Sequence, residues 1–281
     1  MPSVSVPASR LPRLLSIAGS DSGGGAGIQA DLKAFARCGA HGMTAITAIT
    51  AQNTVGVRSV WAVPGEAIVD QVRAVVEDIG VDAVKIGMLG SVDAIAAVAE
   101  ALDLLGEVPV VLDPVMVAEN GAVLLDEGAR SALVERLVPR ATVVTPNLPE
   151  ARALTDHDDA PPPESLARSI HALGPHAVVV TGGHQEEATD VFFDGHRLAR
   201  LPGERYAGDA AHGSGCTHSS AMAAGLALGL DPLEAARWAR VLASEAVRDG
   251  LSDLGAGAGP VNVLGSIRAR EPPVGESSGL A

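Results

Sequence analysis

Short apolar runs alternate with stretches of helical periodicity along most of the chain. The first apolar run, at residues 14–18, is followed by Ile28, Leu32 and Phe35, which are spaced as one face of a helix. The same alternation predicts further strands at 43–51, 57–63, 83–86, 108–112, 142–145 and 177–180. It also predicts helices from Pro64 to 79, at 92–105, 128–137, near 147, 164–173 and 213–228, and from Asp231 onward.

Strands that alternate with helices of this length indicate an α/β fold. We expect a mostly parallel central sheet with helices on both faces, which is a three-layer α/β/α arrangement. Residues 191–193 and 196–201 flank Asp194-Gly195 and predict a β-hairpin, which we expect to be a small appendage. No linker divides the middle of the chain. We therefore expect one domain at 13–267, a disordered leader at 1–12 and a flexible tail at 268–281.

Composition and charge narrow the functional classes. The chain has 281 residues and a formal net charge of −14, and aromatic residues make up only 2% of it. Nucleic acids and anionic membranes attract dense Lys and Arg, and base stacking needs aromatic rings, so we expect neither as a partner. Cys38 and Cys216 are too few for a disulfide framework. No apolar stretch reaches the length of a membrane span or resembles a secretory signal, so we expect a cytoplasmic protein.

A glycine-rich segment follows the first predicted strand. Residues 25–30 fit the G-x-G-x-x-A fingerprint of dinucleotide sites, but that motif also requires an acid at the end of the next strand, and 42–53 contains none. The alternative is a turn that needs glycine for its backbone alone. Asp31 lies one helical turn after Gly27, and Gln52 ends the next strand. Two polar groups that converge on one crevice suit a small heterocycle with both a donor and an acceptor.

A second glycine turn, at 213–215, leads into a helix and predicts an anion site. A Walker A loop is excluded because neither lysine stands in a Gly-Lys-Ser/Thr sequence. In the turn, backbone N–H groups and the positive end of the helix would stabilise developing negative charge. Cys216 lies in the first helical turn, where we expect a lowered thiol pKa, and the alternative is a small buried residue. His212 and His218 could also suggest a Cys/His hydrolase or a metal site, but the ligand spacing is poor.

Polar residues at three further strand ends are candidates for binding phosphate and a metal ion. Asn147 and Glu150 lie three residues apart at a helix start, where they could hold a hydrated Mg²⁺. The alternative is ordinary helix capping by the amide and the acid. Asp113 ends another strand and is a second candidate oxygen ligand. Lys85, one of two lysines, could offset phosphate charge or face solvent.

These segments together resemble one family. Six blocks stand in that family's order, at residues 17–31, 50–54, 85–89, 112–116, 145–150 and 212–217. They resemble the hydroxymethylpyrimidine/phosphomethylpyrimidine kinases of thiamine biosynthesis, which have a ribokinase-like fold. The resemblance extends over about residues 14–263, and six ordered blocks make it far more specific than any one of them.

The resemblance implies ATP-dependent phosphorylation of 4-amino-5-hydroxymethyl-2-methylpyrimidine and then of its monophosphate, with Mg²⁺ as a cofactor. It also implies a homodimer. Asp31 and Gln52 match the positions that hold the pyrimidine, and the residues that line the ring would be Gly19, Met88 and Val115.

The resemblance also implies roles for the phosphate side of the site. The anion hole for the transferring phosphoryl group would be Gly213, Ser214 and Gly215. Cys216 stands where most ribokinase-fold enzymes carry a catalytic Asp base, so we expect the substrate hydroxymethyl group to point at it. Asn147 and Glu150 match the N-x-x-E motif of the Mg-phosphate site. We expect the metal at Glu150 and Asp113, and we expect Lys85 and Thr181 on the nucleotide side.

Two segments depart from the family pattern. Residues 181–184 form a turn where many relatives carry Lys, and His218 and Ser220 replace commoner apolar or small residues. Pyridoxal kinase activity, known among close relatives, is an alternative function. A non-catalytic pyrimidine-binding regulator is an alternative from another class, but it would not need the intact 213–216 turn or the N-x-x-E motif.

Overall fold

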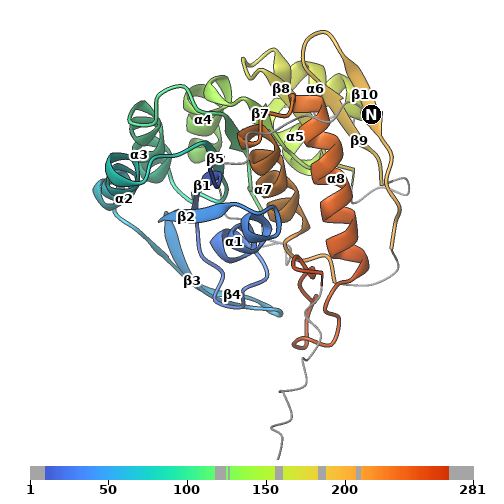
Figure 1. Ribbon diagram of the computed structural model, residues 1–281, viewed down its shortest axis with the longest axis horizontal. Helices are drawn as coiled ribbons and strands as arrows, with labels where there is room; N and C mark the ends of the chain where they lie inside the picture. Colours follow the sequence, from blue (N-terminus) through green and yellow to red (C-terminus); the bar gives the residue numbers. More distant parts are fainter. Residues whose placement is uncertain are drawn as a thin grey trace, which may run out of the picture.

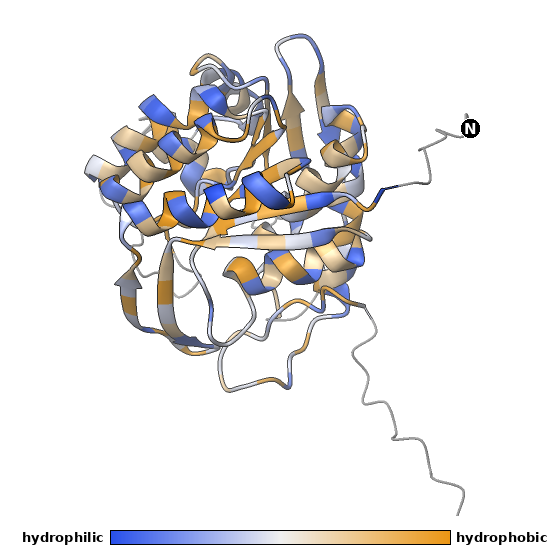
Figure 2. Ribbon diagram, turned by 60° about the vertical axis from the view of Figure 1, so that its left-hand side comes forward, coloured by the Kyte–Doolittle hydropathy of each residue, from blue (hydrophilic) through white to orange (hydrophobic). Residues whose placement is uncertain are grey.

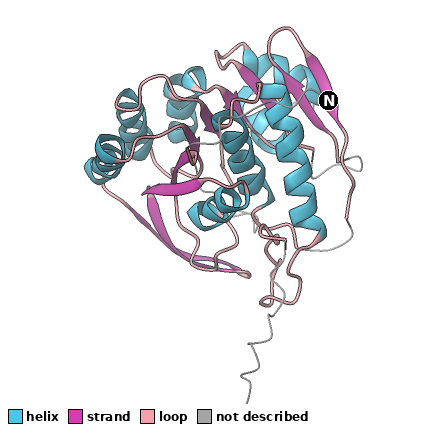
Figure 3. Cartoon of the chain, viewed as in Figure 1, coloured by secondary structure: helices cyan, strands magenta, loops and turns pink. Residues whose placement is uncertain are grey.

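The computed structural model describes residues 10–117, 125, 127–155, 161–182, 188–206 and 210–265. Its centre is an eight-stranded sheet with the strand order β10-β9-β8-β7-β6-β5-β1-β2 (Figures 1 and 3). Neighbouring strands from β2 to β8 are parallel, whereas β8, β9 and β10 pair antiparallel. The strands are β1 (Arg13–Ala18), β2 (His41–Ile46), β5 (Ala83–Ile86), β6 (Val110–Leu112), β7 (Val143–Val144), β8 (Ala177–Val180), β9 (Asp190–Phe193) and β10 (Leu198–Leu201).

Helices cover both faces of this sheet. One layer consists of α1 (Gly27–Arg37), α7 (Ser214–Ala227) and α8 (Pro232–Arg248). The opposite layer consists of α2 (Gly65–Asp78), α3 (Val92–Asp103), α4 (Glu127–Arg136), α5 (Leu148–Thr155) and α6 (Pro163–His171), with a short 3-10 turn at Val138–Arg140. Figure 1 shows α7 and α8 side by side on the near face of the sheet.

Successive residues of the central strands face opposite layers. Leu14 on β1 and Ala83 on β5 pack in the cluster beneath α1, α7 and α8, whereas Leu15 and Val84 pack in the cluster beneath the other five helices. Strands buried on both faces need no polar residues, which explains their continuous apolar runs in Figure 2. The predicted three-layer α/β/α fold is confirmed.

The predicted strand at 43–51 is in fact two strands that belong to different sheets. The chain leaves the main sheet at Thr47, whose N–H donates to Ala18 O and whose hydroxyl donates to Met88 O at 2.8 Å. Beyond it, β3 (Ala48–Asn53) pairs antiparallel with β4 (Gly56–Ala62) in a separate two-stranded sheet. Thr is a good strand former, so nothing local marked the break.

The hairpin predicted around Asp194-Gly195 is present, but it is no appendage. Its strands β9 and β10 pair with each other and continue the main sheet beyond β8. Phe192 is fully buried in the cluster beneath α7 and α8. The separate small hairpin of this fold is the β3–β4 sheet.

Helix starts largely follow their sequence signals. Asp231 caps α8 by accepting bonds from the N–H groups of Leu233 and Glu234, as predicted. Pro64 stands at the N-cap of α2. Ile79 was predicted to continue the buried face of that helix, but α2 ends before it and the side chain is 40% exposed.

Several expectations fall outside the described residues, which begin at 10 and end at 265. They concern most of the leader, the whole tail at 268–281, residues 156–160 of a predicted loop, and 183–184 of the turn after β8. Within the described part of the chain, no helix is both long enough and apolar enough to cross a membrane.

Candidate active site

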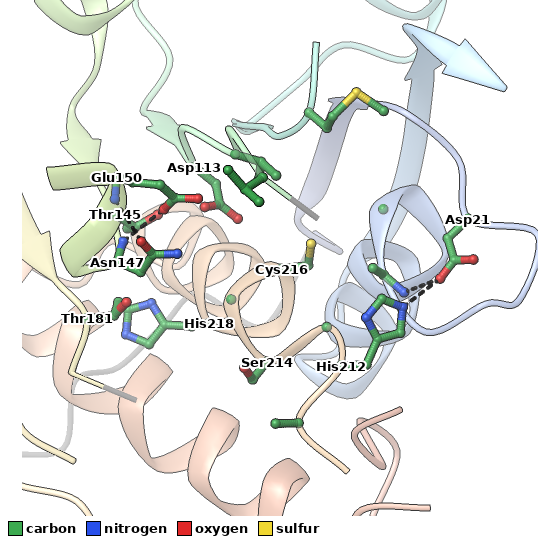
Figure 4. Close-up of a pocket in the computed structure, with 18 of the residues that line it drawn as sticks. Asp21, Asp113, Thr145, Asn147, Glu150, Thr181, His212, Ser214, Cys216 and His218 are labelled. Atoms are coloured by element: carbon green, nitrogen blue, oxygen red, sulfur yellow. Dashed lines mark hydrogen bonds and ion pairs between the residues drawn. The ribbon is translucent and has the colours of Figure 1, made fainter. Parts of the chain in front are cut away.

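A cavity of about 1040 Å³ opens where the parallel strands end and α7 begins (Figure 4). Residues that follow β1, β5, β6, β7 and β8 line it, together with the first turn of α7. Every predicted site residue except Asp31 contributes to the lining: Gly19, Gln52, Lys85, Met88, Asp113, Val115, Asn147, Glu150, Thr181, Gly213, Ser214, Gly215 and Cys216. Seven segments that are far apart in sequence therefore line one site.

Asp31 lies behind the cavity wall rather than in it. Its side chain is fully buried, and its carboxylate accepts hydrogen bonds from Ser16 Oγ at 2.6 Å and Ser220 Oγ at 2.8 Å. On α1, Asp31 shares the face of Ile28 and Phe35, which packs against the rest of the protein. The structure therefore corrects the expectation that Asp31 touches the pyrimidine.

Lys85 is the cavity residue that Asp31 supports. Its Nζ lies 2.8 Å from Asp31 Oδ1 and 3.9 Å from Asp113 Oδ2, and the side chain is fully buried. Burial alone would lower the pKa of Lys85, but the two carboxylates outweigh it and raise that pKa, so the ammonium group stays charged. The solvent-facing alternative for Lys85 is wrong.

The glycine-rich segment after β1 is held by Asp21. Its carboxylate accepts hydrogen bonds from the N–H groups of Gly23, Gly25 and Ala26. The same carboxylate contacts His212 Nε2 at 3.1 Å, and Figure 4 shows both side chains on one side of the cavity. Burial opposes ionisation, but these bonds hold the pKa of Asp21 below its usual range. Nothing in the sequence alone marks Asp21 as the residue that orders this loop.

The anion turn requires glycine at its first position. Gly213 has φ +86°, a left-handed conformation, and a Cβ there would collide with the carbonyl oxygen of Gly25. The two glycine segments are therefore in direct contact. After Gly213, α7 begins with its N–H groups toward the cavity, which is the geometry expected of an anion site.

Cys216 is partly exposed at the centre of the cavity (Figure 4). Burial raises the pKa of its thiol to about 12, and the carboxylates of Asp31 and Asp113 add to the effect, while Lys85 opposes it. The predicted lowering of this pKa by the helix start is therefore wrong. At neutral pH the group is a thiol.

Asn147 and Glu150 stand at the start of α5, where the structure confirms the capping interpretation, and the magnesium interpretation stays a prediction. Asn147 Oδ1 accepts from Glu150 N at 2.9 Å, and Glu150 Oε2 accepts from Asn147 N at 2.9 Å, which is a reciprocal capping box. Both residues also line the cavity beside Asp113 (Figure 4). Burial and the neighbouring Asp113 raise the pKa of Glu150 to about 8. Burial also raises the pKa of Asp113, against the pull of Lys85.

These two carboxyl groups suit a cation. Asp113 raises the pKa of Glu150 because two buried negative charges repel, and a bound cation would relieve that repulsion. Mg²⁺ is commonly held by one or two carboxylates together with phosphate oxygens and water. Among the described residues there is no cluster of three His, Cys, Asp or Glu side chains suited to a metal. Glu150 and Asp113 therefore fit a magnesium ion that arrives with a nucleotide.

Asp190, His218 and Arg240 form a second polar cluster in the cavity lining, and the sequence did not predict this cluster. His218 Nε2 lies 3.4 Å from Asp190 Oδ2, and Arg240 Nη1 lies 3.6 Å from Asp190 Oδ1. All three residues line the cavity. The sequence offered one signal, the spacing of His218 four residues after Ser214 on a predicted helix. Nothing local indicated Asp190 or Arg240.

An anion site at a helix start, a buried lysine and a pair of carboxyl groups at the carboxyl edge of a parallel sheet define a small-molecule phosphotransferase. The sequence matches the model of the phosphomethylpyrimidine kinase family over residues 21–262, and the chain belongs to that family. The enzyme is thus a kinase with a ribokinase-like α/β fold.

Individual relatives agree with this assignment. The chain is 51% identical over 255 residues to the hydroxymethylpyrimidine/phosphomethylpyrimidine kinase of Rhizobium meliloti, covering 88% of this chain and 95% of that protein. It is 47% identical to the thiamine biosynthesis bifunctional protein ThiED of Geobacter sulfurreducens, covering 89% of this chain and 51% of that protein. Among solved structures, the Staphylococcus aureus pyridoxal kinase in complex with AMP-PCP and pyridoxal is similar, with a TM-score of 0.83 and 32% identity over 93% of this chain and 96% of that one.

Proposed function

We propose that this kinase transfers the γ-phosphoryl group of ATP to 4-amino-5-hydroxymethyl-2-methylpyrimidine and then phosphorylates the monophosphate to the diphosphate, for thiamine biosynthesis. The observation that supports this most is the composition of the single cavity. Gln52, Met88 and Val115 lie in the same cavity as the 213–216 anion turn and the Asp113–Glu150 carboxyl pair. One site can thus hold a small ring and a phosphate chain together.

The pyrimidine end is built where β1, β5 and the β3–β4 sheet meet. Gly19 N donates to Met88 O at 3.0 Å, and a Cβ on Gly19 would collide with the Met88 methyl group. Glycine at this position therefore lets Met88 cover the ring. Gln52 Oε1 lies 3.4 Å from the Thr50 hydroxyl, a contact that orients the amide for a heterocycle with a donor and an acceptor.

The phosphate end aligns the groups and neutralises their charge. Phosphoryl transfer needs chiefly positioning and electrostatic stabilisation, with little covalent work by the protein. We assign the transferring group to the N–H groups of 213–216 and the substrate hydroxyl to Cys216, which Figure 4 places between the Glu150 side and the Asp21 side of the cavity. Lys85 supplies a permanent positive charge. Glu150 and Asp113 would hold Mg²⁺, which neutralises phosphate charge when it is bound.

One assay tests the function. The enzyme is incubated with ATP, Mg²⁺ and the hydroxymethylpyrimidine, and ADP and both phosphorylated pyrimidines are measured over time. We expect monophosphate first and diphosphate after it, and Gln52→Ala should raise KM for the pyrimidine about tenfold while leaving KM for ATP unchanged. Absence of both pyrimidine products, with active enzyme shown by another acceptor, contradicts the proposal.

Pyridoxal is the second candidate acceptor. The similarity in fold to the pyridoxal kinase of Staphylococcus aureus favours it, at 32% identity. Pyridoxal is therefore assayed in parallel, and the two kcat/KM values are compared. A larger value for pyridoxal would replace the pyrimidine as the principal substrate.

We further propose a cytoplasmic homodimer with one kinase domain at 13–267. The β3–β4 sheet supports the dimer, because the cross-strand neighbours Ile49 and Trp61 are 51% and 57% exposed. An apolar pair on an exposed sheet face is a suitable contact surface. The sheet also carries Gln52, so a partner on this face would brace the pyrimidine end of the cavity.

A further inference from the structure

His218 is a buried histidine whose ring has no hydrogen bond. The side chain is 3% exposed, and neither Nδ1 nor Nε2 has a hydrogen-bond partner among the described residues. A polar group buried without a partner lowers stability, so such a group in a cavity points to a ligand. His218 lines the cavity described above and has no role in the chemistry assigned so far.

The ring lies on the phosphate side of the cavity. His218 follows Ser214 by one helical turn on α7, so both residues share one face of the helix. Figure 4 shows the imidazole beside Thr181 and below Asn147, on the same side as Glu150. Thr181 and Asn147 form an isolated parallel β-bridge beyond the ends of the neighbouring strands β8 and β7. This face of α7 thus meets the part of the cavity where a phosphate chain would lie.

Asp190 orients the imidazole from behind. Its Oδ2 lies 3.4 Å from His218 Nε2, and its Oδ1 accepts from Gly182 N at 2.9 Å. Burial disfavours the carboxylate, but His218, Arg240 and Gly182 hold the pKa of Asp190 below its usual range. An anionic Asp190 favours a hydrogen on the nearer ring nitrogen. A neutral imidazole carries one N–H, so donation from Nδ1 to a phosphate oxygen requires a second ring proton, which the anions on either side of the ring would favour.

The charges of the cavity indicate that a bound phosphate chain needs a further hydrogen-bond donor. Its carboxyl groups are Asp21, Asp113, Glu150 and Asp190, whereas its permanent cations are Lys85 and Arg240. Lys85 is already paired with Asp31, and Arg240 bonds to the Ala188 carbonyl as well as facing Asp190. A phosphate chain entering an acidic cavity needs additional N–H donors. An imidazole held between Asp190 and a phosphate oxygen supplies one.

We propose that His218 is a nucleotide-binding residue whose ring, protonated on both nitrogens when the nucleotide is bound, donates from Nδ1 to the phosphate chain, with Asp190 as the acceptor that positions the ring. This proposal rests on the proposed kinase function in one respect, which is that the enzyme binds a nucleotide. It does not depend on which acceptor is phosphorylated.

The test measures binding without turnover. The Kd of ADP with Mg²⁺ is measured by calorimetry for the wild type, His218→Leu and His218→Gln, and inorganic triphosphate is measured as a competitor of ADP. His218→Leu should raise the Kd of ADP and the inhibition constant of inorganic triphosphate by about tenfold each. His218→Gln retains an N–H donor and should recover part of the loss. His171→Leu, a histidine outside the cavity that packs against Phe193, is the matched control and should bind ADP as the wild type does.

Stability separates this role from a structural one. Leucine leaves the buried Asp190 carboxylate without its His218 contact, so His218→Leu should unfold below the wild-type temperature, whereas His218→Gln, which can still donate to Asp190, should unfold close to that temperature and still bind ADP more weakly than the wild type. Unchanged ADP affinity would overturn the proposal, as would a loss for ADP with no loss for inorganic triphosphate, which places the contact on the nucleoside. Failure of the wild type to phosphorylate the pyrimidine would leave these binding results intact and would count against the substrate assignment alone.

Discussion

Asp31 and Lys85 form a fully buried ion pair that joins α1 to β5, with Lys85 as the member that reaches the cavity. The pair is held by two further hydroxyl groups, from Ser16 and Ser220. Breaking one partner of a buried pair leaves an uncompensated charge, which is far more destabilising than the pair itself is stabilising. The site therefore depends on a residue that the ligands do not touch.

Asp31→Asn should lower the free energy of unfolding by roughly 3 kcal/mol, because it strands the Lys85 ammonium group in the interior. Urea unfolding measures this loss. The double variant Asp31→Asn/Lys85→Met should lose less than the sum of the single changes. A ring-binding role for Asp31 would instead appear as a raised KM for the pyrimidine with unchanged stability, and that result would contradict the structural assignment.

Cys216 carries a testable consequence of its raised pKa, which is about 12. If the thiolate is the base that takes the substrate proton, only the minor deprotonated form is active at neutral pH. Log kcat should then rise by about one per pH unit from pH 7 to 9, and Cys216→Ala should lower kcat about 100-fold and flatten the profile. Initial rates at saturating substrates measure both.

The matched control is Cys216→Ser, which keeps a hydroxyl for positioning but has no thiolate. A flat wild-type profile, with Cys216→Ser close to wild type in kcat, would leave Cys216 a positioning residue.

At the scale of elements, the start of α5 serves folding and function with the same atoms. The Asn147–Glu150 capping box closes the helix end, and it also presents a carboxyl group beside Asp113. Helix capping therefore does not exclude the proposed cation binding by Glu150. This short helix therefore brings the buried carboxyl group of Glu150 close to the buried carboxyl group of Asp113.

The pH dependence of stability follows from this arrangement. The pKa of Glu150 is raised from 4.5 in the unfolded chain to about 8 in the fold, so the folded state binds the extra proton. Its contribution to stability is complete below about pH 4.5 and is lost as the pH rises through 8. Glu150→Gln should remove part of that loss. Denaturant unfolding of both proteins without Mg²⁺ at pH 5.5 and 8.5 measures the difference, and an equal pH dependence in the two would contradict it.

Sequence reasoning worked best for elements that are decided locally. The strand at 83–86 was located to the residue because it is buried on both faces and its residues other than Lys85 are apolar. It failed at Thr47, where the chain changes sheets through hydrogen bonds to Ala18 and Met88, which are distant in sequence. The sequence placed Asp31 on the helix that follows the glycine segment, but it could not say that this side chain meets Lys85 rather than a ligand. The contact of His218 with Asp190 has no local signature either.

At the scale of the whole molecule, the exposed apolar face of the β3–β4 sheet is the feature that bears on assembly. Trp61 pairs across the strands with Ile49 and is 57% exposed. Trp61→Glu should place a charge in the proposed contact and convert the dimer to a monomer. Light scattering after size exclusion measures the mass. Val241→Glu, at a valine on α8 that is 56% exposed, is the control and should stay dimeric. A monomeric wild type would exclude the dimer.

The contact between Asp21 and His212 joins residues that lie 191 positions apart. Gly25 and Gly213 touch at the same place, so the glycine loop near the start of the chain has no counterpart until α7 has been synthesised. A growing chain that contains every strand of the main sheet still lacks the 213–216 turn, which follows β10 in the sequence. We therefore expect translation products that end before residue 213 to lack the phosphotransferase activity.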